Sequence, residues 1–84
     1  MNTLTVEDID RIREVLEKYG KLPVAIASVN NEDDLYDAGL TSHASVNVMI
    51  ALEDEFDVEF PDRLLQKSTF ASVAAIADAV AELA

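Results

Sequence analysis

Hydrophobic residues recur every three or four positions in several segments of this chain, and alternating strand patterns are almost absent. From Val6 to Tyr19 this spacing predicts an amphipathic helix, which Thr5 and Asp8 would begin as a capping box with a shortened acid. Gly20 follows as a stop signal. A second helix is predicted from Ser42 to Phe56, a segment rich in apolar residues.

The remaining segments are shorter or less regular. A connection from Lys21 to Leu40 contains scattered apolar residues, so we expect it to lie against the core. A single helical turn is predicted for residues 62–66. A final helix is predicted from Thr69 to Leu83, with Ser68 or Thr69 as its cap. These elements predict an all-α bundle.

The second helix carries more apolar residues than one buried stripe needs. Its buried side is expected to consist of Val46, Met49, Ile50 and Phe56, widened by Val48 and Leu52. The positions expected to face solvent are Asn47, Ala51, Asp54 and Glu55. A helix this apolar has to be covered on two sides, so we expect it at the centre of the bundle.

Length and composition limit the function classes. Eighty-four residues, half of them hydrophobic, make one small domain that spans residues 1–84. The absence of cysteine excludes disulfides and thiolate metal sites, and a single histidine excludes a multi-histidine metal site. Because the chain has neither a membrane-spanning run nor a signal peptide, we expect a soluble, cytoplasmic, stand-alone protein.

The charge of the chain is strongly negative and unevenly placed. A formal net charge of −11 makes nucleic-acid binding unfavourable. Ten of the seventeen acidic residues lie between Lys21 and Arg63, where no basic residue occurs. This concentration either keeps a small domain soluble or forms a docking surface for basic partners. The acids lie on both sides of Ser42, which favours docking, and the two interpretations are compatible.

Ser42 stands where the acidic loop ends and the second helix begins, in the segment Gly39-Leu40-Thr41-Ser42-His43. A serine here can cap the helix, anchor a phosphate-linked group at the positive end of the helix dipole, or do both. A hydrolytic nucleophile is disfavoured, because the adjacent His43 diverges from it by about 100° on a helix. The G-x-S-x-G pattern of many hydrolases is also absent.

A set of short motifs runs through the middle of the chain. They are Asp34-Leu35, Gly39-Leu40, Ser42, the segment Leu52 to Phe56, and Phe60-Pro61-Asp62. With these motifs the chain resembles the acyl carrier protein family. The resemblance implies a small four-helix bundle with a long first loop and a short third helix. It also implies that a magnesium-dependent phosphopantetheinyl transferase attaches 4'-phosphopantetheine from coenzyme A to Ser42.

In this family the arm holds a cargo as a thioester and delivers it to partner enzymes, so the carrier itself would not be an enzyme. Two positions depart from the family pattern: Thr41 and His43 stand where aspartate and leucine are usual. The aspartate ordinarily helps the transferase engage, and the leucine lines contacts with partners and with the arm. The departures favour a specialised carrier over the main carrier of fatty acid synthesis. The sequence leaves a fatty acyl, a short acyl and an aminoacyl cargo open, and our hypothesis is an amino acid or a short polar acyl unit.

The implied partners are the transferase and a cargo-loading ligase or synthase with a basic docking surface, and the carrier is expected to be monomeric. The residues expected to contact such partners are Asp37, Asn47, Glu53, Asp54, Glu55 and Asp57. The alternative from another class is an acidic helical interaction module that never receives a prosthetic group.

Overall fold

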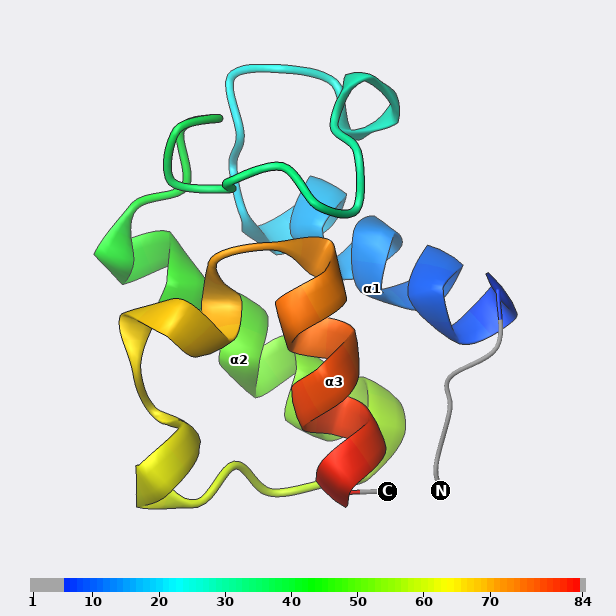
Figure 1. Cartoon of the computed structure of the whole chain (residues 1–84), viewed down its shortest axis with the longest axis vertical. Helices are drawn as coiled ribbons and strands as arrows, with labels where there is room; N and C mark the ends of the chain where they lie inside the picture. The colour runs from blue at the N-terminus through cyan, green and yellow to red at the C-terminus, as the bar shows by residue number, and fades with distance from the viewer. Residues whose placement is uncertain (1–5, 84) are drawn as a thin grey trace.

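A computed structural model of the chain describes residues 6–83. Its elements are α1 (Val6–Tyr19), η1 (Ile26–Ser28), α2 (Ser42–Phe56), η2 (Asp62–Leu64), η3 (Lys67–Phe70) and α3 (Val73–Leu83), where η denotes a 3₁₀ helix (Figure 1). The described range contains no strand, which confirms the all-α prediction. Thr5 lies outside this range, and with it the predicted capping box. Within residues 6–83 no helix is long and apolar enough to cross a membrane.

The part of the chain after α2 differs from the prediction. The expected short third helix is the 3₁₀ turn η2, so residues 6–83 hold three α-helices and 3₁₀ turns instead of four helices. α3 begins at Val73 and not at Thr69, and its cap is Ser72, whose Oγ accepts the N–H of Ala75 at 3.0 Å. Before Val73 the chain forms the 3₁₀ helix η3, and the Ala71 carbonyl accepts the Leu35 N–H of the long loop at 2.7 Å.

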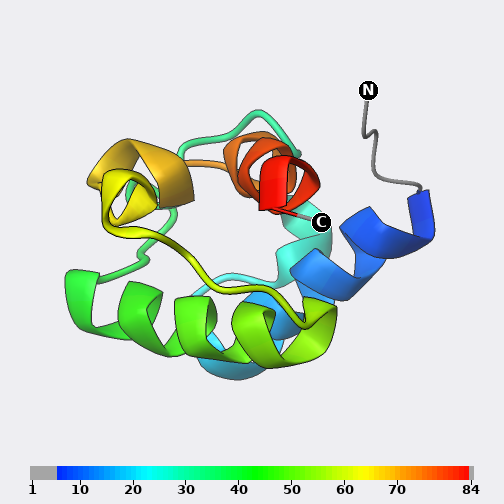
Figure 2. The same ribbon diagram turned by 90° about the horizontal axis from the view of Figure 1, so that it is seen from below.

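The core lies where the three α-helices and the long loop meet. In Figure 2, α2 runs along one side of the molecule, α3 lies opposite, and α1 crosses beside them. The largest fully buried side chains come from all of these segments: Ile12, Leu16, Leu35, Val48, Leu52, Val73, Ile76 and Val80. Burial of each such side chain contributes about 1.5–3 kcal/mol, and this packing fixes α2 against the rest of the fold.

The connection between α1 and α2 packs against the core, as predicted. Its apolar residues Val29, Leu35 and Leu40 are buried. Arg13 of α1 donates from one guanidinium nitrogen to the carbonyl oxygens of Ile26 and Val29, at 2.6 and 2.7 Å. These bonds tie the loop to α1, and the Ile26 carbonyl also accepts the Val29 N–H at 3.0 Å.

The last turn of this loop is set by Gly39. Its φ of 116° is a conformation that residues with a side chain rarely adopt. A Cβ at this position would also overlap the ring of Pro23. The next residue, Leu40, donates its N–H to the Leu35 carbonyl at 2.9 Å. The bend therefore leads the chain from the anchored loop directly into α2.

α2 buries a different face from the one predicted. Ala44, Val48 and Leu52 face the core, whereas the side chains of Val46 and Ile50 are 51% and 54% exposed. Successive helical residues turn by about 100°, so positions 46 and 50 lie on the side away from positions 44 and 48. The expectation that α2 is covered on two sides is wrong, and its outer face carries an apolar ridge of Val46 and Ile50. Three further apolar residues of α2 are half-buried: Met49, Ala51 and Phe56.

Candidate functional site

Ser42 is the first residue of α2, and its side chain is exposed. The cap of the helix is Thr41, whose Oγ1 accepts the N–H of Ala44 at 3.0 Å. The sequence allowed Ser42 to be the cap, and this possibility is wrong because α2 already begins at Ser42. The Ser42 hydroxyl therefore has no capping role in the fold.

Ser45, one turn further along, is placed differently. Its side chain is half-buried, and its hydroxyl donates to the carbonyl oxygen of Ser42 at 2.7 Å. An enzyme that modifies a serine on this face would have to break that bond to reach Ser45. Of the two hydroxyls, the one on Ser42 is the accessible one.

The carboxylates of Asp33 and Asp34, in the loop before α2, accept backbone N–H groups of nearby turns. Asp34 Oδ1 accepts the N–H groups of Tyr36 and Asp37, at 2.8 and 3.4 Å. Asp33 Oδ2 accepts the N–H of Asn30 at 2.8 Å. Side-chain bonds of this kind stabilise turns locally. The exposed Asp37 carboxylate is thus better placed to meet a partner than those of Asp33 and Asp34.

A pocket of about 440 Å³ lies beside Ser42, between α2 and the segment that contains η2 and η3. Its lining is mainly apolar: Val46 and Met49 come from α2, and Leu65 and Phe70 come from the opposite side. Val46 and Leu65 are 51% and 47% exposed, so the pocket opens to solvent. Ser42 itself lines this space, which we call the Ser42 pocket.

Tyr36 and Lys67 form another part of the wall of the Ser42 pocket. The Tyr36 hydroxyl donates to the Lys67 carbonyl at 3.2 Å, and the Lys67 ammonium lies 4.8 Å from the centroid of the Tyr36 ring. Burial raises the pKa of Tyr36 above its ordinary value of 10.0, and a hydrogen bond with Ser45 opposes part of that shift. The phenol is therefore a neutral hydrogen-bond donor, and Lys67 brings a positive charge to the pocket.

Comparison with known proteins identifies the kind of site this is. Residues 10–80 match the family described as "Phosphopantetheine attachment site". The chain belongs to this carrier family. A 52% identical relative, the aminoacyl carrier protein of Agrobacterium fabrum (strain C58 / ATCC 33970), aligns over 69 residues, which are 82% of this chain and 83% of the relative. The resemblance stated from the sequence motifs is thereby confirmed.

Two solved structures have the same fold as this carrier. Both are crystal structures of an engineered Bradyrhizobium japonicum glycine:[carrier protein] ligase complexed with a carrier protein from Agrobacterium tumefaciens. In the complex with AMP, the matching chain is 50% identical with a TM-score of 0.84, over 86% of this carrier and 96% of that chain. In the complex with ATP, the values are 48% and 0.87, over 89% and 97%.

The residues around Ser42 fit the phosphopantetheine group of this carrier family. A phosphodiester at the start of α2 would meet N–H groups that the helix leaves unpaired, and the positive end of the helix dipole. Lys67 adds a cation to the same pocket. The apolar surfaces of Val46 and Leu65 suit the less polar part of a long flexible arm. Both the charged and the apolar parts of the group therefore find complementary surfaces in this carrier.

Several residues of the Ser42 pocket were absent from the predicted site, among them Tyr36, Val46, Leu65 and Lys67. Val46 follows Ser42 by one helical turn, and that spacing could have placed it on the same face. No local pattern relates the other three to Ser42, because the packing of distant segments brings them together.

The predicted partner residues of this carrier fall into two groups. The first is exposed: Asp37, Asn47, Asp54 and Asp57. The second is engaged by the fold, because the Glu53 carboxylate accepts the Phe60 N–H at 2.9 Å and Glu55 pairs with Arg11 at 2.8 Å. Arg11 also donates to the Glu55 carbonyl at 2.6 Å. Glu55 is exposed, as predicted, but its carboxylate is already paired with Arg11.

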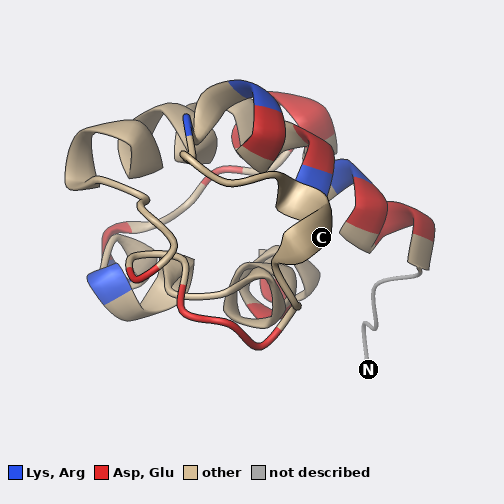
Figure 3. Ribbon diagram, turned by 90° about the horizontal axis from the view of Figure 1, so that it is seen from above, with Lys and Arg blue, Asp and Glu red and all other residues tan. Residues whose placement is uncertain are grey.

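Charge is also unevenly spread along α2 of this carrier. Figure 3 shows its N-terminal part without charged residues and its C-terminal part with acidic ones. Twelve residues separate Ser42 from Asp54, which is about 18 Å along the helix axis. Acidic residues therefore lie on two sides of Ser42: Asp37 in the loop before α2, and others at the C-terminal end of the helix. The surface next to the serine is mainly apolar.

Proposed function

We propose that Ser42 bears the 4'-phosphopantetheine arm of this carrier and that the arm carries an amino acid. The observation that carries the first part is the exposed Ser42 hydroxyl, which has no capping role and lines a mainly apolar pocket. When attached, the arm supplies a thiol that holds the cargo as a thioester. The residues of the chain present the serine to a transferase, pair with the phosphate and shelter the arm, and the carrier performs no catalysis.

The proposed cargo follows from the relatives. The 52% identical protein is an aminoacyl carrier, and the matching chains occur in complexes with a glycine:[carrier protein] ligase. A small polar cargo also suits the Ser42 pocket, because it is open and includes the polar groups of Tyr36 and Gln66 beside its apolar surface. An amino acid:[carrier protein] ligase is the proposed loading partner. A net charge of −11 opposes self-association, so the proposed active form is a monomer.

The attachment of the arm is tested by intact mass spectrometry after incubation with coenzyme A, Mg²⁺ and a promiscuous phosphopantetheinyl transferase. We expect one phosphopantetheine on the wild type and on the matched control Ser45→Ala, and none on Ser42→Ala. Modification of Ser42→Ala would overturn the assignment of the serine. An unmodified wild type would overturn the function and favour the acidic interaction module.

The cargo is tested with the modified carrier, the Bradyrhizobium japonicum ligase, ATP and single amino acids. Loading should increase the mass of the carrier by one aminoacyl group, and hydroxylamine, which cleaves thioesters, should remove it. If coenzyme A thioesters of fatty acids and an acyltransferase load the carrier while no amino acid does, the aminoacyl assignment is wrong.

A further inference from the structure

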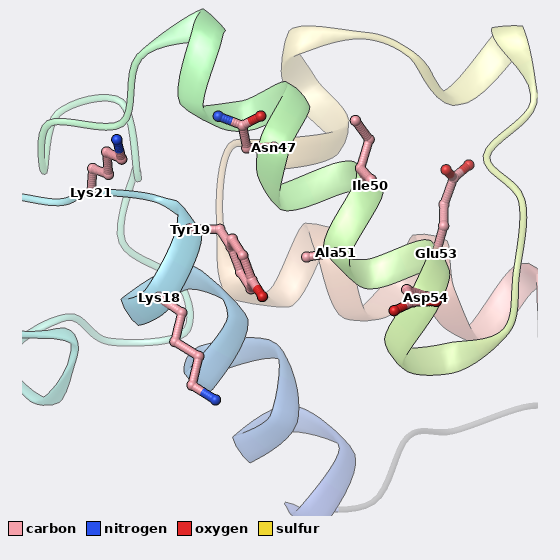
Figure 4. Close-up of a pocket in the computed structure, with 8 residues that line it drawn as sticks. All are labelled: Lys18, Tyr19, Lys21, Asn47, Ile50, Ala51, Glu53 and Asp54. Carbon is pink, nitrogen blue, oxygen red and sulfur yellow. The ribbon is translucent and has the colours of Figure 1, made fainter.

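A second hollow lies on the other flank of the Val46–Ile50 ridge, between the C-terminal end of α1 and the outer face of α2 (Figure 4). Its volume is about 570 Å³. Ser42 and Met49 face the Ser42 pocket, whereas Asn47 and Asp54 line this second hollow. The ridge separates the two, since Val46 lines the first and Ile50 the second. We call the second hollow the α1–α2 groove.

The two walls of the α1–α2 groove carry opposite charges. The α1 side contributes Lys18, Tyr19 and Lys21, and the α2 side includes Glu53 and Asp54. In Figure 4 the Tyr19 ring lies toward α2 near Ala51, and the two lysine side chains extend away on either side of it. The groove therefore has a basic wall, an acidic wall and apolar surface between them.

The apolar surface of the groove is unusually exposed for such side chains. Tyr19 is 47% exposed and Ile50 is 54% exposed. They stand on facing elements and line the same hollow. An apolar side chain from outside would cover both at once, and burial of this kind stabilises complexes more than the exposed charges around it.

The two lysines of the groove have no side-chain partner within residues 6–83, unlike the other basic residues of this range: Arg13 donates hydrogen bonds to the Ile26 and Val29 carbonyls, and Lys67 lies over the Tyr36 ring. Arg11 and Arg63 form ion pairs, with Glu55 and Glu82 respectively, at 2.8 Å each. Lys18 and Lys21 form no ion pair with any carboxylate in residues 6–83, although the chain as a whole carries a net charge of −11. Two cations without internal partners beside an exposed apolar surface are complementary to an acidic and apolar segment of another protein.

We infer that the α1–α2 groove docks a segment of the amino-acid-loading enzyme in which an apolar side chain lies between an acidic and a basic residue. The apolar side chain covers Tyr19 and Ile50, the acidic residue faces Lys18 and Lys21, and the basic residue faces Asp54. Because the two walls carry opposite charges, the segment can bind in only one orientation. This inference rests on the proposed function, because the occupant is the enzyme that loads the arm.

The position of the groove suits this role. Ile50 lies eight residues after Ser42 on the same helix, about 12 Å along its axis. An enzyme that holds the groove and the adjoining ridge can reach the arm while Ser42 and its pocket stay uncovered. A second copy of the chain is a poorer occupant, because each copy brings eleven net negative charges to the contact.

The inference predicts that a loading enzyme binds to the groove side of the ridge and depends on basic and apolar residues there as well as on acidic ones. Charge reversal at Lys18 (Lys18→Glu) should raise the KM for the carrier about tenfold, and truncation of Ile50 (Ile50→Ala) should do the same, with kcat unchanged. The matched controls are Arg63→Glu, which makes the same change of charge at another exposed site, and Val24→Ala, which truncates a side chain that is 44% exposed. Both controls should leave the KM within about twofold of wild type.

The experiment uses the full-length carrier and the Bradyrhizobium japonicum glycine:[carrier protein] ligase. Each variant is first incubated with a transferase, and attachment of the arm is measured by intact mass spectrometry. The affinity of the unmodified protein for the ligase is then measured by calorimetry. Melting curves establish that each variant is folded. Lys18→Glu and Ile50→Ala should be modified normally on Ser42 yet bind the ligase about tenfold more weakly than the controls.

Normal modification of all variants together with equal affinities would overturn the docking inference and leave the proposed function intact. Failure of every protein, wild type included, to accept the arm would overturn the proposed function itself. If light scattering detects a wild-type dimer that Ile50→Ala abolishes, the groove binds a second copy and the inference is wrong.

Discussion

The side-chain oxygen of Thr41 accepts the N–H of Ala44 at 3.0 Å, at the start of the helix whose first residue is Ser42. Thr41 caps the helix, and its neighbour Ser42 presents a hydroxyl to solvent. The cap and the proposed attachment site are therefore adjacent side chains, and mutation can separate their effects.

Replacement of Thr41 by valine should lower the free energy of unfolding by about 1 kcal/mol, because the helix loses its cap. Ser42→Ala should change it by less than about 0.5 kcal/mol, since the Ser42 side chain is exposed and does not cap. Urea denaturation of the unmodified proteins measures both values. A larger loss for Ser42→Ala than for Thr41→Val would contradict the assignment of the cap.

Thr41→Asp should keep the cap, because aspartate accepts the same N–H, and should restore the residue that carriers usually have before the serine. We expect a promiscuous transferase to modify this variant faster than wild type, at unchanged stability. Time courses of arm attachment, followed by mass spectrometry, measure the rate. Equal rates would mean that the aspartate is not needed here.

The stability of the carrier should fall as the pH rises above about 10, in part because of Tyr36. Burial raises the pKa of Tyr36 in the folded chain above its ordinary value of 10.0. Between the unfolded and folded values the unfolded chain binds fewer protons, so rising pH favours unfolding. Tyr36→Phe should reduce the fall in stability across this interval, whereas the matched change Tyr19→Phe should preserve it. Urea denaturation at several alkaline pH values provides the test.

Gly39→Ala should destabilise the fold by about 1–2 kcal/mol, because the new Cβ meets both an unfavourable φ and the Pro23 ring. Pro23→Ala in the same chain should recover part of that loss by removing the ring. The four proteins form a double-mutant cycle, read by chemical denaturation. Strictly additive effects would show that the two residues do not meet.

Asp54→Lys should slow association with the loading ligase without affecting the fold, since Asp54 is exposed. The wild-type association rate should itself fall as salt shortens the Debye length from about 30 Å at 0.01 M to about 8 Å at 0.15 M. Glu55→Lys is not an equivalent test, because it breaks the ion pair with Arg11 and should lower the melting temperature. Stopped-flow binding across a salt series distinguishes electrostatic docking from a surface that serves solubility alone.

The sequence predicted those features that depend on neighbouring residues in the chain. The bounds of α1 and α2 were correct, because helical periodicity and terminal signals are local. The start of α3 was wrong: residues 67–70 form a 3₁₀ helix, and the Ala71 carbonyl that follows pairs with Leu35 from a distant loop. The buried face of α2 was also wrong: apolar residues occur around most of this helix, so periodicity could not distinguish Val48, which is buried, from Val46, which is exposed.

The same distinction between local signals and distant contacts applies to the candidate site. Ser42 was proposed as the attachment site from motifs that surround it in the chain, and this stays a prediction. The engagement of Glu55 depends on Arg11 of another helix, and that of Glu53 depends on the Phe60 N–H, which lies beyond a left-handed turn at Asp57. Charge composition identifies acidic residues but gives no indication of which ones the fold already uses.

The Val46–Ile50 ridge has a consequence for the order of events in the life of this carrier. The whole molecule has about 5100 Å² of accessible surface, and a standard interface covers about 800 Å² of one partner. On the proposed function, transferase, ligase and acceptor all approach Ser42 beside the same ridge, so they compete for the same surface. The order in which these enzymes bind is then set by competition. Each enzyme has to dissociate before the next one binds, and the state of the arm determines which enzyme binds most tightly.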